Sequence, residues 1–491
     1  MSPFQHGEVF VTDDGAETDL DLGHYERFID LNLTRESTVT TGQIYTEVLQ
    51  RERRGDFLGG TIQIVPHITR AIRERILLVA KISQAQIVLG EIGGTVGDIE
   101  GEPFLEAIRL LRYQLGANNT LFLHLTLLPF LEASGELKTK PTQASVRELR
   151  RIGIAPDLIL ARADHPIEKN LLEKISRFCD VAPQAVIPAP TVQSIYEVPL
   201  NLAKAGLTEI LTQKLKLPKR PPRLNAWRKL VTTIKKPKKT LQIACVGKYT
   251  NLDDAYLSVN EALKAAAFKY QYQPKIVWVT ADKLKKATSS EWQKLREAAG
   301  ILIPGGFGER GIEGKVLAAR FAREQQKPYF GLCLGLQILI IEFARNVLGW
   351  PQANSEEFDS KTPKPVIHFL PEQRGLNAKG GTMRLGRYAC ALEQNSLAFK
   401  LYQRKLIHER HRHRYEFNND FKADFEQAGL KITGLNPRQN LAEICELKGH
   451  PFMLGCQFHP EFLSRPTKPH PLFLGFIEQA LKGKNPDSPN S

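Results

Sequence analysis

Cysteine is scarce in this sequence and never closely spaced. The 491 residues include no Cys-x-x-Cys pair, and the six cysteines stand at positions 179, 245, 333, 390, 445 and 456. Single cysteines so far apart argue against both a disulfide framework and a zinc site. We therefore expect free thiols and a reducing, cytoplasmic location.

Long apolar runs are also absent. No run reaches the roughly 18 uncharged apolar residues of a membrane span. The opening Met-Ser-Pro-Phe-Gln-His-Gly-Glu has neither the basic nor the apolar region of a secretory signal. We expect no membrane partner. At 42% hydrophobic content, a chain of this length can form two or three domains with cores of their own.

One segment has no acidic residues. Residues 214–239 contain eleven lysines and arginines, which account for most of the net charge of +14. The segment also contains four prolines, so we interpret it as a solvated linker, with a docking patch for RNA or an acidic partner as the alternative. Most of the net charge therefore belongs to this one segment, and we expect no nucleic-acid partner.

One of the cysteines has a distinctive setting. The stretch Gly331-Leu-Cys-Leu-Gly follows a short apolar run and precedes a segment of helical periodicity, which predicts a sharp strand-to-helix turn. Glycines permit such a turn, and the following helix directs its positive end toward the sulfur. Taken alone, Leu-Cys-Leu could equally be buried core, because free cysteine is among the most buried residue types.

Two further stretches favour a catalytic cysteine. The stretch Gly305-Gly-Phe-Gly follows an apolar run, where a strand ending in glycines can offer backbone N–H groups to an oxyanion. The stretch Gln457-Phe-His-Pro-Glu supplies an imidazole and a carboxylate, the pair that deprotonates a thiol and fixes the tautomer of the base.

Together these three signatures resemble a class I glutamine amidotransferase domain. In that family a cysteine attacks the side-chain amide of glutamine, a thioester forms, and ammonia leaves. The resemblance implies Cys333 as nucleophile, His459 as base, Glu461 as its orienting group and Gly306 as oxyanion donor. The other implied glutamine contacts are Leu334, Gly335, Leu336, Gln337, Glu357 and Arg414, the last being suited to bidentate binding of a carboxylate.

The first half of the sequence alternates strand and helix patterns. Strands are expected at 60–66, 86–90, 120–127 and 157–162, and helices at 44–53 and 67–80. This alternation predicts a parallel sheet flanked by helices, and a second sheet restarts at 241–247. The predicted fold class is α/β with two parallel-sheet domains.

Three polar stretches in the first half are candidate ligand contacts. Residues 13–21 are rich in carboxylates, which could hold a hard cation or form a solvated turn. Residues 91–100 form a glycine-rich turn at a strand end, where α/β sheets place ligands. Residues 138–143, Lys-Thr-Lys-Pro-Thr-Gln, could bind a triphosphate or form an ordinary exposed loop.

These stretches, placed before an amidotransferase domain, resemble the CTP synthase family over roughly residues 1–480. The resemblance implies a P-loop-like amidoligase domain, in which ATP phosphorylates O4 of UTP and ammonia displaces the phosphate to give CTP. It implies Mg²⁺ ligands at Asp21 and Glu91, and an ammonia route past His6. The implied ATP contacts are Asp21, Arg162 and Val192, and the implied UTP and CTP contacts are Asp98, Ile99, Glu100, Lys138, Thr139, Lys140, Pro141, Thr142, Gln143 and Lys174.

The resemblance also implies partners and regulation. The substrates would be UTP, ATP and L-glutamine, with CTP as feedback inhibitor, GTP as allosteric activator and a homotetramer as the assembly. The glycine-flanked stretch 380–386 is expected to be the mobile lid associated with GTP. The histidine-rich stretch 408–416 is not expected to bind metal, because its interleaved arginines repel cations.

The expected divisions are an N-terminally truncated amidoligase domain at 1–217, a basic linker at 218–239, the amidotransferase domain at 240–482 and a disordered tail at 483–491. The sequence has no Gly-x-x-x-x-Gly-Lys-Ser/Thr phosphate loop. Phosphoryl transfer depends on donors positioned around the phosphates, so we expect the synthase half to lack activity. The alternatives to a CTP synthase are a glutaminase with an inactive synthase half and a non-enzymatic regulatory subunit.

Overall fold

The computed structural model describes residues 7–236, 238–248, 253–369 and 383–483. The chain divides into two compact units, of which the first combines residues up to Arg35 with those from Lys236 onward, and the second comprises Glu36–Lys235. This division into units differs from the domain boundaries expected from the sequence, and those boundaries stay a prediction.

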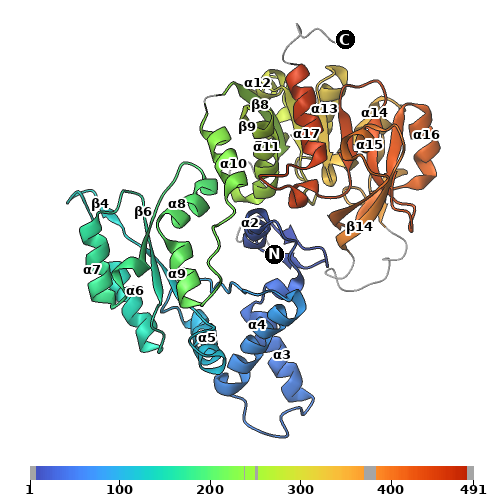
Figure 1. Ribbon diagram of the computed structural model, residues 1–491. Helices are drawn as coiled ribbons and strands as arrows, with labels where there is room; N and C mark the ends of the chain where they lie inside the picture. Colours follow the sequence, from blue (N-terminus) through green and yellow to red (C-terminus); the bar gives the residue numbers. More distant parts are fainter. Residues whose placement is uncertain (1–6, 237, 249–252, 370–382, 484–491) are drawn as a thin grey trace. The chain divides into compact units, whose positions relative to one another are not determined.

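The first unit is built on a nine-stranded mixed sheet (Figure 1). Its strand order is β15-β14-β17-β18-β19-β11-β10-β8-β9. Strands from β19 to β9 pair in parallel, as expected, whereas β15 to β19 pair antiparallel. The strands are β8 (Thr240–Gly247), β9 (Gln273–Thr280), β10 (Gly300–Ile303), β11 (Tyr329–Leu332), β14 (Arg384–Leu392), β15 (Leu406–His413), β17 (Leu430–Leu435), β18 (Ala442–Leu447) and β19 (Met453–Cys456).

Helices cover both faces of this sheet. On one face lie α11 (Leu257–Lys269) and α17 (Pro471–Lys482), and on the other lie α13 (Ile312–Glu324), α14 (Leu334–Asn346) and α16 (Lys422–Gln427). Helix α14 is buried on all sides, because its first turns are apolar around the whole circumference. A small sheet of β12 (Ala353–Ser355), β13 (Lys364–Phe369) and β16 (Tyr415–Phe417) lies beside it.

Residues 7–35 pack within the first unit. They form a two-stranded hairpin, β1 (Phe10–Val11) with β2 (Glu17–Thr18), followed by helix α2 (Leu20–Ile29). Phe10, Val11 and Leu22 build a small hydrophobic core with Phe462, which follows β19 in the chain. Apolar burial therefore joins this N-terminal segment to the large sheet.

The second unit contains a three-stranded parallel sheet in the order β3-β6-β7, as the alternating pattern predicts. Its strands are β3 (Leu123–Leu127), β6 (Leu158–Ala163) and β7 (Val186–Pro190), beside a hairpin of β4 (Phe130–Leu131) and β5 (Glu136–Leu137). Its α-helices are α3 (Thr41–Arg53), α4 (Thr69–Ser83), α5 (Glu102–Leu115), α6 (Lys140–Arg151), α7 (Lys169–Cys179), α8 (Val198–Lys204), α9 (Leu207–Lys214) and α10 (Asn225–Lys235).

Two expected strands are wrong. Residues 64–68 form a π-helical turn leading into α4, and residues 86–90 pair with no strand in the described chain. An apolar run becomes a strand only where a neighbour accepts its backbone hydrogen bonds. Without one, Ile87 and Leu89 are exposed by 52% and 87%.

The basic segment is not an extended connector along its whole length. Helix α10 lies inside it, and its residues Leu230 and Val231 are buried. Trp227, on the same helix, packs against Tyr196 with ring centroids 5.7 Å apart. Apolar residues at helical spacing thus order this part of a segment whose composition predicted a solvated linker.

Candidate functional site

Cys333 lies at the sharp turn between β11 and α14. Its backbone has φ 51° and ψ −100°, a conformation that side-chain-bearing residues rarely adopt. The Cys333 N–H donates to the Cys456 carbonyl at 2.7 Å, which ties the turn to β19. A Cβ on Gly331 would stand 2.5 Å from the Gly335 carbonyl group, so the flanking glycines allow the chain to cross itself closely.

The imidazole of His459 is held by a carboxylate. Its Nδ1 donates to Glu461 Oε1 at 2.7 Å, and both residues are buried. Burial alone would lower the pKa of His459, but the charges of Glu461 and Cys333 raise it to about 10. The ring is therefore an imidazolium at neutral pH that interacts with the Cys333 sulfur.

Strand β15 supports both catalytic candidates through its main chain. The Arg410 carbonyl accepts the His459 N–H at 2.8 Å. The Arg412 carbonyl lies 3.7 Å from the Cys333 Sγ. The ring of Phe462 stacks on the His459 ring with centroids 5.1 Å apart and planes 13° from parallel.

The glycine loop after β10 adjoins the nucleophile turn. A Cβ on Gly306 would stand 3.4 Å from Leu334, the residue after the cysteine. The Gly308 N–H donates to Glu357 Oε1 at 2.8 Å, and Lys248 Nζ donates to the Phe307 carbonyl. Gly306, the predicted oxyanion donor, thus lies in a loop whose next two residues, Phe307 and Gly308, are held by hydrogen bonds.

Charges of both signs gather beside this loop. Burial raises the pKa of Glu357, opposed by the Gly308 hydrogen bond and by the charges of Lys248, Arg414 and Lys315. Lys315 is 1% exposed, and burial together with Lys248 lowers its pKa to about 7. A carboxylate and cations in one place suit the ammonium and carboxylate of a free amino acid.

The remaining predicted glutamine contacts begin helix α14. Gln337 Nε2 donates to the Tyr415 carbonyl at 3.1 Å and lies 3.5 Å from Gln457 Oε1. The Gly335 carbonyl accepts the Tyr329 hydroxyl at 2.7 Å. The Leu336 side chain is buried against β19 at Gly455, which leaves only its backbone for a ligand.

Sequence reasoning missed Gln457, Lys248 and Lys315. Gln457 Nε2 lies 3.7 Å from the Cys333 Sγ, and its position inside the quoted Gln-Phe-His-Pro-Glu signature could have suggested it. The two lysines carried no signal, because a single lysine in a helix or after a strand is common on protein surfaces.

Gly305 leaves space for the catalytic ring. A Cβ at this position would stand 2.6 Å from His459 Cε1, and the buried ring has no room to retreat. We expect Gly305→Ala to lower the rate of glutamine hydrolysis by about 100-fold, the effect of displacing a catalytic group by roughly 1 Å. Gly42→Ala, whose Cβ would meet nothing closer than 4.0 Å, is the matched control. Equal kinetics for the two variants would contradict this geometry.

The second unit contains the predicted UTP and CTP residues. The Lys138 Nζ contacts Glu136 and lowers the pKa of that carboxyl group, to which the charge of Lys174 adds a smaller effect in the same direction. Thr142 is buried, and its hydroxyl donates to Thr126 at 3.1 Å. Asp98 accepts the Thr95 N–H at 3.0 Å, which closes the glycine-rich turn before Ile99 and Glu100. Thr139, Lys140, Pro141 and Gln143 lie at the start of α6.

The other predicted nucleotide and metal residues are distributed over both units. Asp21 is exposed on α2 of the first unit, whereas Glu91, Arg162 and Val192 belong to the second. His6 and residues 380–382 of the expected lid lie outside the described residues, whereas residues 384–386 of that stretch belong to β14. In the described ranges, no cluster of three or more His, Cys, Asp or Glu suits a metal ion, and no helix is long and apolar enough to span a membrane.

Known proteins resemble both parts of the chain. Residues 1–217 match the family model of the CTP synthase N-terminus, and residues 251–479 match that of class-I glutamine amidotransferase. The CTP synthase of Dehalococcoides mccartyi (strain CBDB1) is 56% identical over 495 residues, covering 100% of this chain and 91% of its own. That of Pelotomaculum thermopropionicum is 56% identical over 484 residues, covering 99% and 90%. A solved structure of a Trypanosoma brucei CTPS glutaminase domain with bound acivicin is 38% identical, covers 49% of this chain and 94% of its own, and has a TM-score of 0.47.

Proposed function

The chain belongs to the CTP synthase family, and from that premise we propose that Cys333 releases ammonia from L-glutamine for the ATP-dependent amination of UTP to CTP. This activity is that of a ligase that forms a C–N bond with glutamine as amide donor. The observation that carries the glutaminase assignment is the buried His459–Glu461 pair beside a strained Cys333.

The proposed glutaminase reaction proceeds in two steps. The Cys333 sulfur attacks the side-chain amide carbon of glutamine, and the His459 imidazolium gives its proton to the departing ammonia. The resulting thioester is hydrolysed by a water molecule that His459 deprotonates, which yields glutamate and restores the Cys333 thiolate beside the His459 imidazolium. Glu461 holds the ring throughout, and the Gly306 and Leu334 N–H groups stabilise the oxyanion of each tetrahedral intermediate.

The glutamine backbone is proposed to bind between Glu357 and Arg414. The Glu357 carboxylate would accept hydrogen bonds from the ammonium group, and the Arg414 guanidinium would bind the carboxylate of glutamine. Both side chains lie in the charged region beside the glycine loop, where each influences the other electrostatically.

Arg414→Ala is expected to raise KM for glutamine by about 10- to 100-fold with a smaller change in kcat, because a charged hydrogen bond contributes roughly 1.5–3 kcal/mol and is already made in the ground state. Arg320→Ala, which removes an exposed arginine from an ion pair with Glu324, is the control and should match the wild type. An unchanged KM for Arg414→Ala would exclude this carboxylate site.

The nucleotide and metal contacts of the synthase half remain those implied by the family. Asp21 and Glu91 are exposed carboxylates, and carboxylate oxygens are the ligands that Mg²⁺ prefers. When bound, Mg²⁺ would neutralise phosphate charge. The proposed nucleotide contacts are Asp98, Ile99, Glu100, residues 138–143 and Lys174 for UTP and CTP, with Arg162 and Val192 for ATP.

Regulation and assembly are proposed on the same family premise. GTP would be the activator, CTP the feedback inhibitor and a homotetramer the assembly. A cytoplasmic location agrees with the six unpaired cysteines of the chain.

Two assays on this chain separate the candidate functions. One measures glutamate released from glutamine, and the other measures CTP formed from UTP, ATP and ammonia. We expect glutamate release, and its absence would contradict the proposed role of Cys333. Glutamate without CTP would favour the glutaminase-only alternative, and neither product would favour the regulatory subunit.

A further inference from the structure

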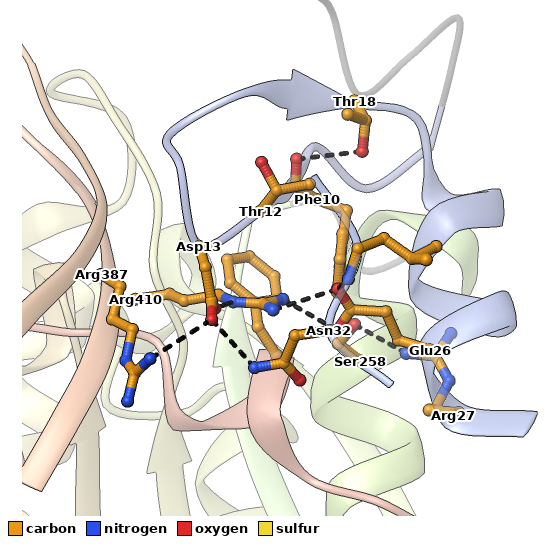
Figure 2. Close-up of polar contacts among 12 residues, drawn as sticks. Phe10, Thr12, Asp13, Thr18, Glu26, Arg27, Asn32, Ser258, Arg387 and Arg410 are labelled. Carbon is orange, nitrogen blue, oxygen red and sulfur yellow. Dashed lines mark hydrogen bonds and ion pairs between the residues drawn. The ribbon is translucent and has the colours of Figure 1, made fainter. Parts of the chain in front are cut away.

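Helix α2 of the N-terminal segment carries a carboxylate into the interior of the first unit. Glu26 is fully buried, and its two oxygens accept four hydrogen bonds. Two come from the guanidinium of Arg410, at 2.9 and 3.0 Å, in a bidentate arrangement. The third comes from Arg465 Nη2 at 2.8 Å, and the fourth from the Leu33 N–H at 2.8 Å. Figure 2 shows Glu26 and Asp13 on either side of Arg410.

Both arginines that bind Glu26 also contact groups that hold the proposed base, His459. Arg410 belongs to β15, and its carbonyl accepts the His459 N–H at 2.8 Å. Arg465 Nη1 donates to the Phe462 carbonyl at 2.9 Å, and the Phe462 ring stacks on that of His459. One carboxylate therefore supports the main chain of His459 on one side and its ring on the other.

Neighbouring residues of the same segment reinforce this contact. Asp13 accepts the Arg410 Nε–H at 2.5 Å and the Asn32 amide at 3.0 Å (Figure 2). The Phe10 ring meets Phe462 edge-on with centroids 5.0 Å apart. Since Arg410 is 0% exposed, its charge has no water to compensate for the loss of these carboxylates.

We propose that Glu26 is a positioning residue for His459 in the glutaminase reaction, an inference that rests on the proposed function. Glu26 touches neither substrate nor reacting atoms. It acts by fixing Arg410 and Arg465, and through them the position of the imidazole relative to Cys333. Residues 1–217 match the CTP synthase N-terminus, so the glutaminase base is supported by a residue from the other family region.

The test compares Glu26→Gln with Glu342→Gln in the whole chain. Glu342 is also fully buried and ion-paired, with Arg323 at 2.8 Å, but it lies on α14, where none of its ion pairs or hydrogen bonds within the described residues reaches His459. Both variants should lose thermal stability. Only Glu26→Gln should lose kcat for glutamine hydrolysis, by about 10- to 100-fold, with KM changed by less than about threefold, because misplacing a base slows chemistry and leaves substrate binding intact.

Two outcomes would overturn the proposal: a kcat for Glu26→Gln within about twofold of the Glu342→Gln value, or a rise in KM in place of the fall in kcat. Should Glu26→Gln fail to fold, Arg465→Lys keeps a positive charge near Glu26 but removes the fork to the Phe462 carbonyl. Its kcat should fall about fivefold or more, and an unchanged kcat would refute the proposal. A wild-type chain without glutaminase activity would instead defeat the proposed function itself.

Discussion

Cys333→Ala is expected to abolish glutamine hydrolysis, with a loss on the order of 10⁴-fold or more, because no other group can form the thioester. Cys333 is the only cysteine among the six whose backbone has a positive φ in the described chain, and it lies beside the His459–Glu461 pair. Ammonia bypasses amide cleavage, so any synthesis of CTP that the chain supports with added ammonia should be retained.

Cys245→Ala is the matched control for this substitution. Cys245 is 0% exposed in β8, and burial raises the pKa of its thiol far above the ordinary value, so it is an inert core residue. The control should keep wild-type kinetics. Residual glutaminase activity near the wild-type rate in Cys333→Ala would show that another residue is the nucleophile.

Glu461→Gln is expected to lower kcat by roughly 10²- to 10⁴-fold and to change its pH dependence. Burial alone would lower the pKa of His459, but Glu461 and Cys333 raise it to about 10. Because the protonated ring must give its proton to ammonia, the wild-type rate should persist to about pH 9 and fall as pH rises through the pKa of His459. Without the Glu461 charge that pKa falls, so the alkaline limb should move to lower pH.

The measurement is kcat for glutamate release from pH 6 to about pH 10.5, on both proteins at saturating glutamine. An alkaline limb at the same pH in Glu461→Gln would contradict the electrostatic role of this carboxylate. A limb that moves to higher pH would show that Glu461 lowers the pKa of His459 instead of raising it.

The family, fold class and enzyme class predicted from the sequence are confirmed by the family models and by the CTP synthases that span the chain. The sequence patterns that predicted them consist of residues close together in the chain. A turn such as Gly-Leu-Cys-Leu-Gly restricts its own backbone, and His459 reaches Glu461 across two residues. The individual site roles stay predictions, which the substitutions above test.

Features that depend on distant pairing could not be predicted from the sequence. Glu26 and Arg410 are separated by 384 positions, and nothing in an acidic cluster on a short helix indicates that one carboxylate is buried. Lys315 is similar, because a lysine in helix α13 would ordinarily face solvent. The strand predicted at 86–90 was wrong for the same reason, because a strand forms only where another strand pairs with it, and the run itself does not show whether one does.

Labelling with a chloroketone analogue of glutamine, mapped over all six cysteines by mass spectrometry, tests whether Cys333 is the nucleophile of glutamine hydrolysis. We expect one label per chain, on Cys333, with glutamine protecting this residue and glutaminase activity lost in proportion to the label. Glutamine hydrolysis by a chain fully labelled at Cys333, or inactivation with the label on another residue, would contradict this role of Cys333.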